Sequence, residues 1–237
     1  LWRLERQGAV DRIRFTTSHP RDLTDELISA VAECSRVCEH IHLGLQSGSD
    51  RILEAMNRGY TRERFLERAE AIRRKIPSAS ITTDVIVGFC GETEEDFLDT
   101  VDVIERVKFD LVYSFKYSPR PMTRAFGMAD DVAPEVKAER LERLHRVIDR
   151  VEKERLHALI GTVQQVMVEG PSIRDGSAWS GRTRCNRVVN FTSESQLEAG
   201  QTVDVEITQS RSHTLWGRRS EGAGSNGSRA GILSGLE

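Results

Sequence analysis

The sequence predicts an α/β protein in which a partial TIM-like (βα) barrel is followed by a small all-β barrel. Between residues 10 and 160, strand-like runs and amphipathic helical patterns alternate four times, which is typical of a parallel sheet covered by helices. Beyond Gly161 the pattern changes to short strand-like runs separated by Gly, Ser and Asp, which favours a β-barrel. We therefore expect a barrel portion over 1–160, a β-barrel over 161–219 and a disordered Gly/Ser-rich tail over 220–237.

The composition fits a globular protein, with 38% hydrophobic residues and a net charge of -3. This charge excludes a strongly basic protein, so nucleic-acid binding would need a local patch. No apolar run approaches the ~18 residues of a membrane span. Four scattered cysteines favour a reducing, cytoplasmic location over a disulfide framework. The chain starts without Met, and four βα units are half of an eightfold barrel, so we expect a portion of a longer protein.

Apolar alternation or continuous β-branched runs predict the strands of the first domain, at 10–15, 40–46, 81–87 and 111–117. The run 81–87 suits burial on both faces of a parallel sheet. Asp84 interrupts this run, and its apolar neighbours predict a dry setting for its carboxylate.

Helix starts are predicted by side chains that cap the first turn. Thr24, Thr61 and Thr93 each precede a helical apolar pattern, and Asp96 stands where it would complete a capping box with Thr93. The apolar spacing of the first helix continues to Cys38, so we expect that helix to reach this residue. A long last helix should begin at Pro134, which suits a first turn, and end near Gly161.

Polar and small residues follow each predicted strand, where the ligand site of a parallel βα array forms. Gln46 and Ser47 can donate and accept hydrogen bonds, which suits a ribose or an amide edge. Gly88 lets the backbone approach a ligand closely. The four stretches are TTSHP (16–20), LQSGS (45–49), GFCGET (88–93) and YSPRP (117–121).

The cysteines and histidines offer few complete chemical sites. Cys34 and Cys38 have a C-x-x-x-C spacing, but no third cysteine follows closely and both fall on an apolar stripe, so we expect core residues. Cys90 marks the rim of the site without a neighbouring base. Cys185 lies among arginines, a setting that can lower the pKa of a thiol, but no base or nucleophile stands beside it in the sequence. His40 and His42 share a strand face, yet no carboxylate or thiol beside them completes a metal set.

The run GRTRCNRVVNF predicts a strand with an arginine face. In this strand Arg182 and Arg184 would share one face, with Arg187 on the other unless a bulge intervenes. Arg211 and Trp216 add a further charge and a flat ring. Arginine beside an aromatic ring suits RNA, since the guanidinium binds phosphate and the ring stacks on a base. The alternative is a solvated strand face whose charge is offset by the acids of the same domain.

Several motifs together resemble a known family. LGLQSGSDRILEAMNRGYTRERF, ITTDVIVGFCGETEEDF, FKYSPRPMTRA, and VEGPS followed by SGRTRCNRVVNF are similar to motifs of the radical S-adenosylmethionine (SAM) methylthiotransferases, in particular the MiaB type that acts on tRNA. The resemblance runs from about residue 10 to 219 and implies the back half of a radical SAM barrel followed by an RNA-binding TRAM domain. Cys90 and Met122 stand where the family often has Pro and Gly.

The resemblance implies a transferase that adds a methylthio group to C2 of N6-isopentenyladenosine at position 37 of tRNA. Its cofactors would be SAM and two [4Fe-4S] clusters, the second supplying sulfur, and its partner the tRNA anticodon stem-loop. The C-x-x-x-C-x-x-C ligands of the family are absent here. We therefore expect this chain alone to bind neither cluster and to be inactive.

The resemblance also assigns site residues by position. Those expected around SAM are Gln46, Ser47, Gly88, Tyr117, Ser118 and Arg120. Those expected at tRNA, with one added from the charge pattern, are Arg182, Arg184, Asn186 and Arg211.

Two alternatives stay open at this point: a related methylthiotransferase that acts on another tRNA nucleoside or on a ribosomal protein, and an RNA-binding protein without catalysis.

Overall fold

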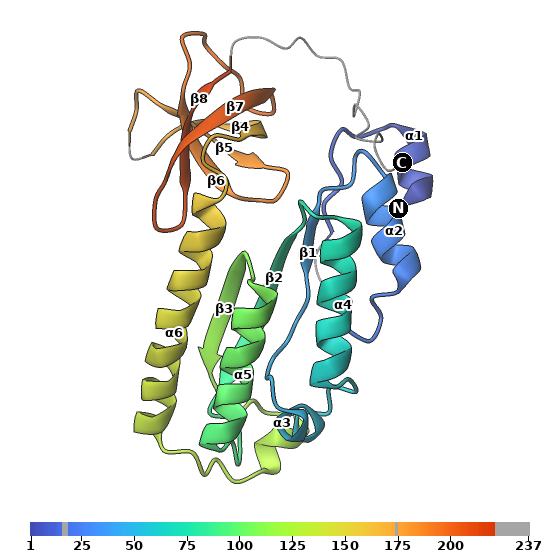
Figure 1. The fold of residues 1–237 in the computed structure, drawn as a ribbon, viewed down its shortest axis with the longest axis vertical. Coiled ribbons are helices and arrows are strands. Elements are labelled where there is room, and N and C mark those ends of the chain that lie inside the picture. Colours follow the sequence, from blue (N-terminus) through green and yellow to red (C-terminus); the bar gives the residue numbers. More distant parts are fainter. Residues whose placement is uncertain (16–18, 174, 221–237) are drawn as a thin grey trace, which may run out of the picture.

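The computed structural model describes residues 1–15, 19–173 and 175–220. A three-stranded parallel sheet with covering helices forms the first domain, and a closed five-stranded barrel forms the second. Figure 1 shows the barrel stacked on one end of the sheet, above the long helix α6 that leads into it. The predicted fold class, a partial (βα) barrel followed by a small β-barrel, is confirmed.

The sheet of the first domain has the order β1-β2-β3, with β2 in the centre and all pairs parallel. Its helices lie on one side of the sheet, with α4, α5 and α6 in front of it in Figure 1. The elements are α1 (Trp2–Gln7), α2 (Asp25–Glu33), β1 (His40–His42), α3 (Asp50–Ala55), α4 (Arg62–Lys75), β2 (Ser80–Val87), α5 (Glu94–Val107), β3 (Leu111–Lys116), the 3-10 turn η1 (Arg124–Gly127) and α6 (Pro134–His157).

The predicted helix starts are confirmed by hydrogen bonds. The hydroxyls of Thr24, Thr61 and Thr93 each accept a backbone N–H of the following first turn. Asp96 completes the capping box by accepting the backbone N–H of Thr93 at 2.8 Å. Pro134 opens α6 as expected. These starts were predictable because each cap depends only on residues within one turn.

Two predicted strands are wrong in extent. The segment 10–15 forms no strand, and Ile13 makes only a single parallel bridge to Val37. Its two arginines instead donate to backbone carbonyls of the second domain, Arg12 to Arg182 and Arg14 to Thr183. The predicted strand 40–46 is reduced to β1, and beyond β1 Gln46 makes an isolated parallel bridge to Val85.

The helix expected to reach Cys38 ends at Glu33. Cys34 has extended dihedral angles as its C-cap, and the chain then runs toward the sheet, where Val37 pairs with Ile13. Both cysteines are nonetheless buried, so their expected core role is confirmed. Helical spacing alone could not place this end, because buried residues of the following extended segment prolonged the apolar pattern.

Helices cover only one face of the sheet. Ile41, Ile81 and Val85 point toward the helices and are fully buried with Phe97 in the main core. The other side, which we call the open face, contains Tyr113 and Phe115, whose side chains are 47% and 53% exposed. In the strand register Asp84 pairs with Tyr113 and Ile86 with Phe115, so these four residues lie together on the open face.

The second domain is an antiparallel barrel with one parallel pair, in the order β4-β5-β6-β8-β7. Val166, Val189, Phe191 and Val205 fill its interior with no exposed area. Its strands are β4 (Val163–Pro171), β5 (Trp179–Thr183), β6 (Val188–Thr192), β7 (Thr202–Ser210) and β8 (Leu215–Arg219).

The run predicted as a single arginine-bearing strand is a hairpin. Strands β5 and β6 pair antiparallel, and residues 184–187 form the turn between them. Asn186 adopts φ 65° in this turn, a conformation that Asn tolerates better than most residues. Arg184 therefore does not share a strand face with Arg182.

The tail beyond Ser220 that we expected to be disordered lies outside the described residues. Among the helices that are described, none is both long enough and apolar enough to cross a bilayer.

Candidate nucleotide pocket and RNA-facing barrel

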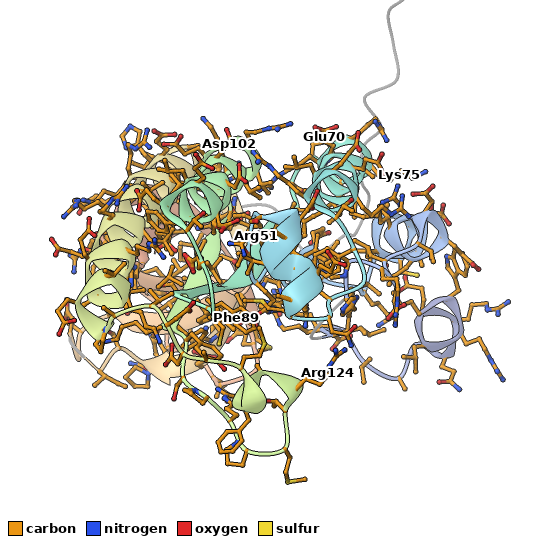
Figure 2. The ribbon with its side chains drawn as sticks, turned by 90° about the horizontal axis from the view of Figure 1, so that it is seen from below. Arg51, Glu70, Lys75, Phe89, Asp102 and Arg124 are labelled. Atoms are coloured by element: carbon orange, nitrogen blue, oxygen red, sulfur yellow. The ribbon has the colours of Figure 1, made fainter. Side chains whose placement is uncertain are left out.

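A pocket of about 490 Å³ opens at the carboxyl end of the sheet, on its open face. Figure 2 looks toward this end, with Phe89 near the centre and Arg124 on η1 at the edge. Its apolar lining includes Met56, Ile86, Phe89 and Phe115. This position agrees with the expectation that polar turns after parallel strands build the ligand site. The stretch 16–18, which follows the first predicted strand, lies outside the described residues.

Four of the six residues expected around SAM line this pocket: Gln46, Tyr117, Ser118 and Arg120. Gln46 reaches it because its left-handed conformation ends the extended segment after β1. The other three come from the segment that leaves β3. The structure thus brings together residues 71 to 74 positions apart in the chain.

Ser47 and Gly88 do not line the pocket. Ser47 is 2% exposed, and its hydroxyl lies 3.4 Å from that of Thr100 on α5. Gly88 has φ 71°, and a Cβ placed there would collide with the side chain of Lys137. Both residues fix the turns that carry pocket residues, and direct contact of either one with a cofactor stays a prediction.

Tyr117 anchors the loop on one side of the pocket. Its hydroxyl donates to the carbonyl of Ala125 at 3.1 Å, and its ring meets Phe89 edge-on with centroids 4.9 Å apart. Burial and a hydrogen bond with Cys90 raise the pKa of Tyr117 to about 12, so the phenol stays protonated and keeps donating. Cys90 itself is buried beside Phe89 and is absent from the pocket lining.

Asp84 and His42 form a polar pair on the open face that the sequence did not reveal. His42 Nε2 lies 3.2 Å from Asp84 Oδ2, and His42 Nδ1 lies 3.0 Å from the hydroxyl of Thr82. Since a carboxylate oxygen only accepts, Nε2 donates to Asp84, and Nδ1 shares the second hydrogen bond of the ring with the Thr82 hydroxyl. Asp84 is therefore partly exposed and lines the pocket, contrary to the dry setting predicted for it.

No group of three or more His, Cys, Asp or Glu side chains in the described part of the chain could hold a metal ion. Cys34, Cys38 and Cys90 are buried and unpaired. The arginines around Cys185 do not lower its pKa on balance. Burial, aided by Glu39 and Asp110, raises that pKa to about 11.

Three of the four residues expected at tRNA lie outside the domain junction or at its edge: Arg182, Asn186 and Arg211. Arg182 is 38% exposed and pairs with Glu169 at 3.0 Å. Its Nη1 also donates to the carbonyl of Asn186 in the β5–β6 turn. Arg211 is exposed and stacks on Trp216, with its guanidinium carbon 4.8 Å from the ring centroid. RNA contacts by these residues stay predictions.

Arg184 contacts the first domain instead of facing solvent. Its guanidinium pairs with Glu39 at 2.8 Å and donates to the carbonyls of Ser35 and Val37. Arg187, from the same turn, pairs with Asp110, which also binds Arg73 and Arg155 of the first domain. The β5–β6 turn therefore docks the barrel on the amino ends of the strands, opposite the pocket.

Comparison with known proteins supports both domains. Residues 1–104 match the Radical SAM superfamily and residues 157–218 match the TRAM domain. Over 217 residues the chain is 48% identical to the tRNA-2-methylthio-N(6)-dimethylallyladenosine synthase of Syntrophomonas wolfei, covering 92% of this chain and 48% of that relative. The chain thus contains a region of the Radical SAM superfamily followed by a TRAM domain. Its first domain is accordingly called the radical SAM domain below, and its barrel the TRAM domain.

Other relatives that match the chain have the same name. Those of Acetivibrio thermocellus and an Acidovorax species are each 49% identical over 208 residues. The matches cover 88% of this chain but 43% and 46% of those relatives. The chain thus spans about half the length of the relatives that it matches.

A solved structure supports the fold alone. Coproporphyrinogen III oxidase from Escherichia coli, a radical SAM enzyme, aligns with a TM-score of 0.51 at 13% sequence identity. The alignment covers 73% of this chain and 46% of that one.

Proposed function

We propose that the protein containing this chain adds a methylthio group to C2 of N6-dimethylallyladenosine at position 37 of tRNA by radical SAM chemistry. The observation on which this depends is 48% identity over 217 residues to a synthase named for that product. The match spans both domains, so it includes the pocket as well as the barrel. The anticodon stem-loop would be the bound part of the tRNA, in the cytoplasm.

The pocket residues fit a nucleoside-bearing cofactor such as SAM. Ile86, Phe89 and Phe115 offer an apolar surface for an adenine ring, while Gln46 and Asp84 offer groups for ribose hydroxyls or an ammonium. Bound SAM supplies hydrogen-abstracting radical chemistry. The chain's own residues would hold the nucleoside and exclude water, because a closed site prevents side reactions of a reactive intermediate.

Iron–sulfur clusters do not fit the described residues in the same way. Three of the four cysteines are buried, and no set of three or more metal ligands comes together among the described residues. We derive no step through either cluster. The proposal is that residues outside this chain hold them and deliver the sulfur, so that the isolated chain has no transferase activity.

The test expresses the complete gene that contains this chain in a bacterium lacking its own 2-methylthio activity. Digested tRNA is analysed by mass spectrometry, and 2-methylthio-N6-dimethylallyladenosine is the expected nucleoside. Asp84→Asn should reduce the product strongly, whereas Asp149→Asn, an exposed residue of α6, should not. If the complete protein leaves the precursor unmodified, the proposal is wrong. A methylthio group on another nucleoside or on a ribosomal protein would identify the alternative substrate.

A further inference from the structure

Four cations line the mouth of the pocket: Arg58, Lys116, Arg120 and Arg124. Within the described part of the chain, none of them forms an ion pair. Arg58 contacts Tyr60, to whose hydroxyl its Nε donates at 3.3 Å. The lining includes one carboxylate, Asp84, which already accepts from His42. We call these four residues the cationic rim.

Four arginines of the TRAM domain differ from the cationic rim because they form ion pairs, whereas Arg211 stacks on Trp216. Arg182 pairs with Glu169 and Arg218 with Glu206, while Arg184 and Arg187 are held by carboxylates of the radical SAM domain. A phosphate could reach the last two only by breaking partly buried pairs that join the domains. The cationic rim needs no such exchange, so its charge is available to an anion.

The rim is held in place by the loop that follows β3. Tyr117 ties this loop to Ala125, and the Thr123 hydroxyl donates to the carbonyl of Arg120 at 2.8 Å. Met122 lies in the loop with φ 69°, and its side chain is fully exposed. The loop thus presents Arg120 and Arg124 on an ordered frame beside the pocket.

Below the rim the pocket is apolar, with Ile86, Phe89 and Phe115 on the open face and the turn after β2. Cations around an apolar floor are complementary to a nucleotide strand, because phosphates carry the charge and bases the apolar surface. Where SAM lies against this floor, an unstacked base of an RNA loop can enter beside it while the flanking phosphates stay outside.

We propose that the cationic rim binds the phosphates of a single-stranded RNA segment on either side of the nucleotide that enters the pocket. This inference rests on the proposed function for the identity of that RNA. It assigns the main phosphate contact to Lys116, Arg120 and Arg124, at the opposite end of the sheet from the TRAM domain. Arg58 adds charge from the turn after α3.

The test measures binding of a fluorescent anticodon stem-loop RNA to the 237-residue chain by anisotropy over a series of salt concentrations. The triple variant Lys116→Gln, Arg120→Gln, Arg124→Gln should bind at least about tenfold more weakly at low salt, and its salt slope should fall by about two units, since each single-strand phosphate contact contributes ~0.7. The matched control, Arg64→Gln, Arg106→Gln, Arg146→Gln, removes the same charge from exposed helix positions and should change affinity less than about twofold.

Equal behaviour of the two triple variants would overturn the inference. Circular dichroism of each variant checks its folding, and Arg124→Gln alone, an exposed change, provides a second variant with a smaller shift of the same sign. Competition with adenosine monophosphate or inorganic phosphate distinguishes a strand site from a site for free phosphate. If only another RNA displaces the bound RNA, the result supports a site for an RNA strand. Displacement by millimolar phosphate contradicts such a site.

Failure of the proposed function gives a separate result. RNA binding by the chain requires no methylthio transfer, so the rim inference stands if affinity depends on the rim while the complete protein forms no product. Conversely, normal product formation by a complete protein with the triple substitution in the cationic rim would support the proposed function and contradict the inference about the rim.

Discussion

Arg184 of the TRAM domain and Glu39 of the radical SAM domain form an ion pair, with 2.8 Å between Nε and Oε2. The Glu39 side chain is 9% exposed, and the two residues lie 145 positions apart in the chain. An arginine expected to bind RNA is thus used to join two domains.

Replacing Arg184 should therefore affect stability more than RNA binding. Arg184→Ala leaves a largely buried carboxylate without its arginine and should cost about 3 kcal/mol of unfolding free energy. Arg182→Ala removes an exposed pair with Glu169 and should cost under ~1 kcal/mol. Urea denaturation measures both values. A larger loss of stability for Arg182→Ala than for Arg184→Ala would contradict the docking role.

Asp110 should make the domain junction sensitive to acid. Burial opposes its ionisation most, but Arg187, Arg155 and Arg73 together outweigh burial and hold the pKa of Asp110 below its usual value. A carboxyl whose folded-state pKa is lowered stabilises the fold above the unfolded-state pKa of ~3.9, and this stabilisation is lost as pH falls through the folded value.

Asp110→Asn removes this charge and should cost about 3 kcal/mol near pH 7, since three arginines lose their shared partner. The difference between the original and the variant chain should shrink as the pH falls below ~4. Denaturation midpoints measured between pH 3 and pH 7 check this. A difference that stays constant with pH would show that the charge of Asp110 is not what stabilises the junction.

Gly88 should tolerate no side chain. Gly88→Ala forces alanine into φ 71° and drives its Cβ into Lys137, so we expect a loss of about 2 kcal/mol or more. Gly161→Ala is the matched control, because Gly161 has φ 82° but no atom within 4 Å of the place that a Cβ would occupy. The control should lose about 1 kcal/mol from backbone strain alone. Equal losses of stability for the two variants, measured by thermal unfolding, would show that the contact with Lys137 adds nothing to the cost at Gly88.

Cys185 should be unreactive in the folded protein. Its pKa is raised to about 11, and its single S–H has two acceptors within reach, since Sγ lies 3.6 Å from the carbonyl oxygens of both Glu39 and Ser78. At pH 8 the thiolate fraction is then small, and iodoacetamide should modify Cys185 only after unfolding in urea. Peptide mass spectrometry before and after unfolding locates the label. Rapid labelling of Cys185 in the native chain would contradict its burial at the junction.

Local signals in the sequence were sufficient for much of the fold. Thr93 and Asp96 form their capping box from neighbouring residues, and β2 follows from its own β-branched run. The segment 10–15 misled because Arg12 and Arg14 bind a domain about 170 residues away, which no local pattern reveals. The β5–β6 turn was missed because it contains neither Gly nor Pro and depends on Asn186 for its left-handed residue.

The pocket was predictable in position but not in detail. Gln46 and Tyr117 follow strands, and the carboxyl ends of parallel strands meet at one edge. Asp84, Ile86 and Phe115 were missed as lining residues, because their joint placement depends on the β2–β3 register and on an open face. The charged Asp84 within the β-branched run was the one sequence signal that one face of β2 is partly exposed.

The TRAM domain and the pocket occupy opposite ends of a sheet whose central strand, β2, has eight residues. At about 3.3 Å per residue, that strand separates the two ends by roughly 23 Å. Because Asp110 and Glu39 fix the domains to each other, the fold sets the distance between the TRAM domain and the pocket. Under the proposed function, an RNA that contacts both ends has to span this distance, which a folded RNA arm can do and a mononucleotide cannot.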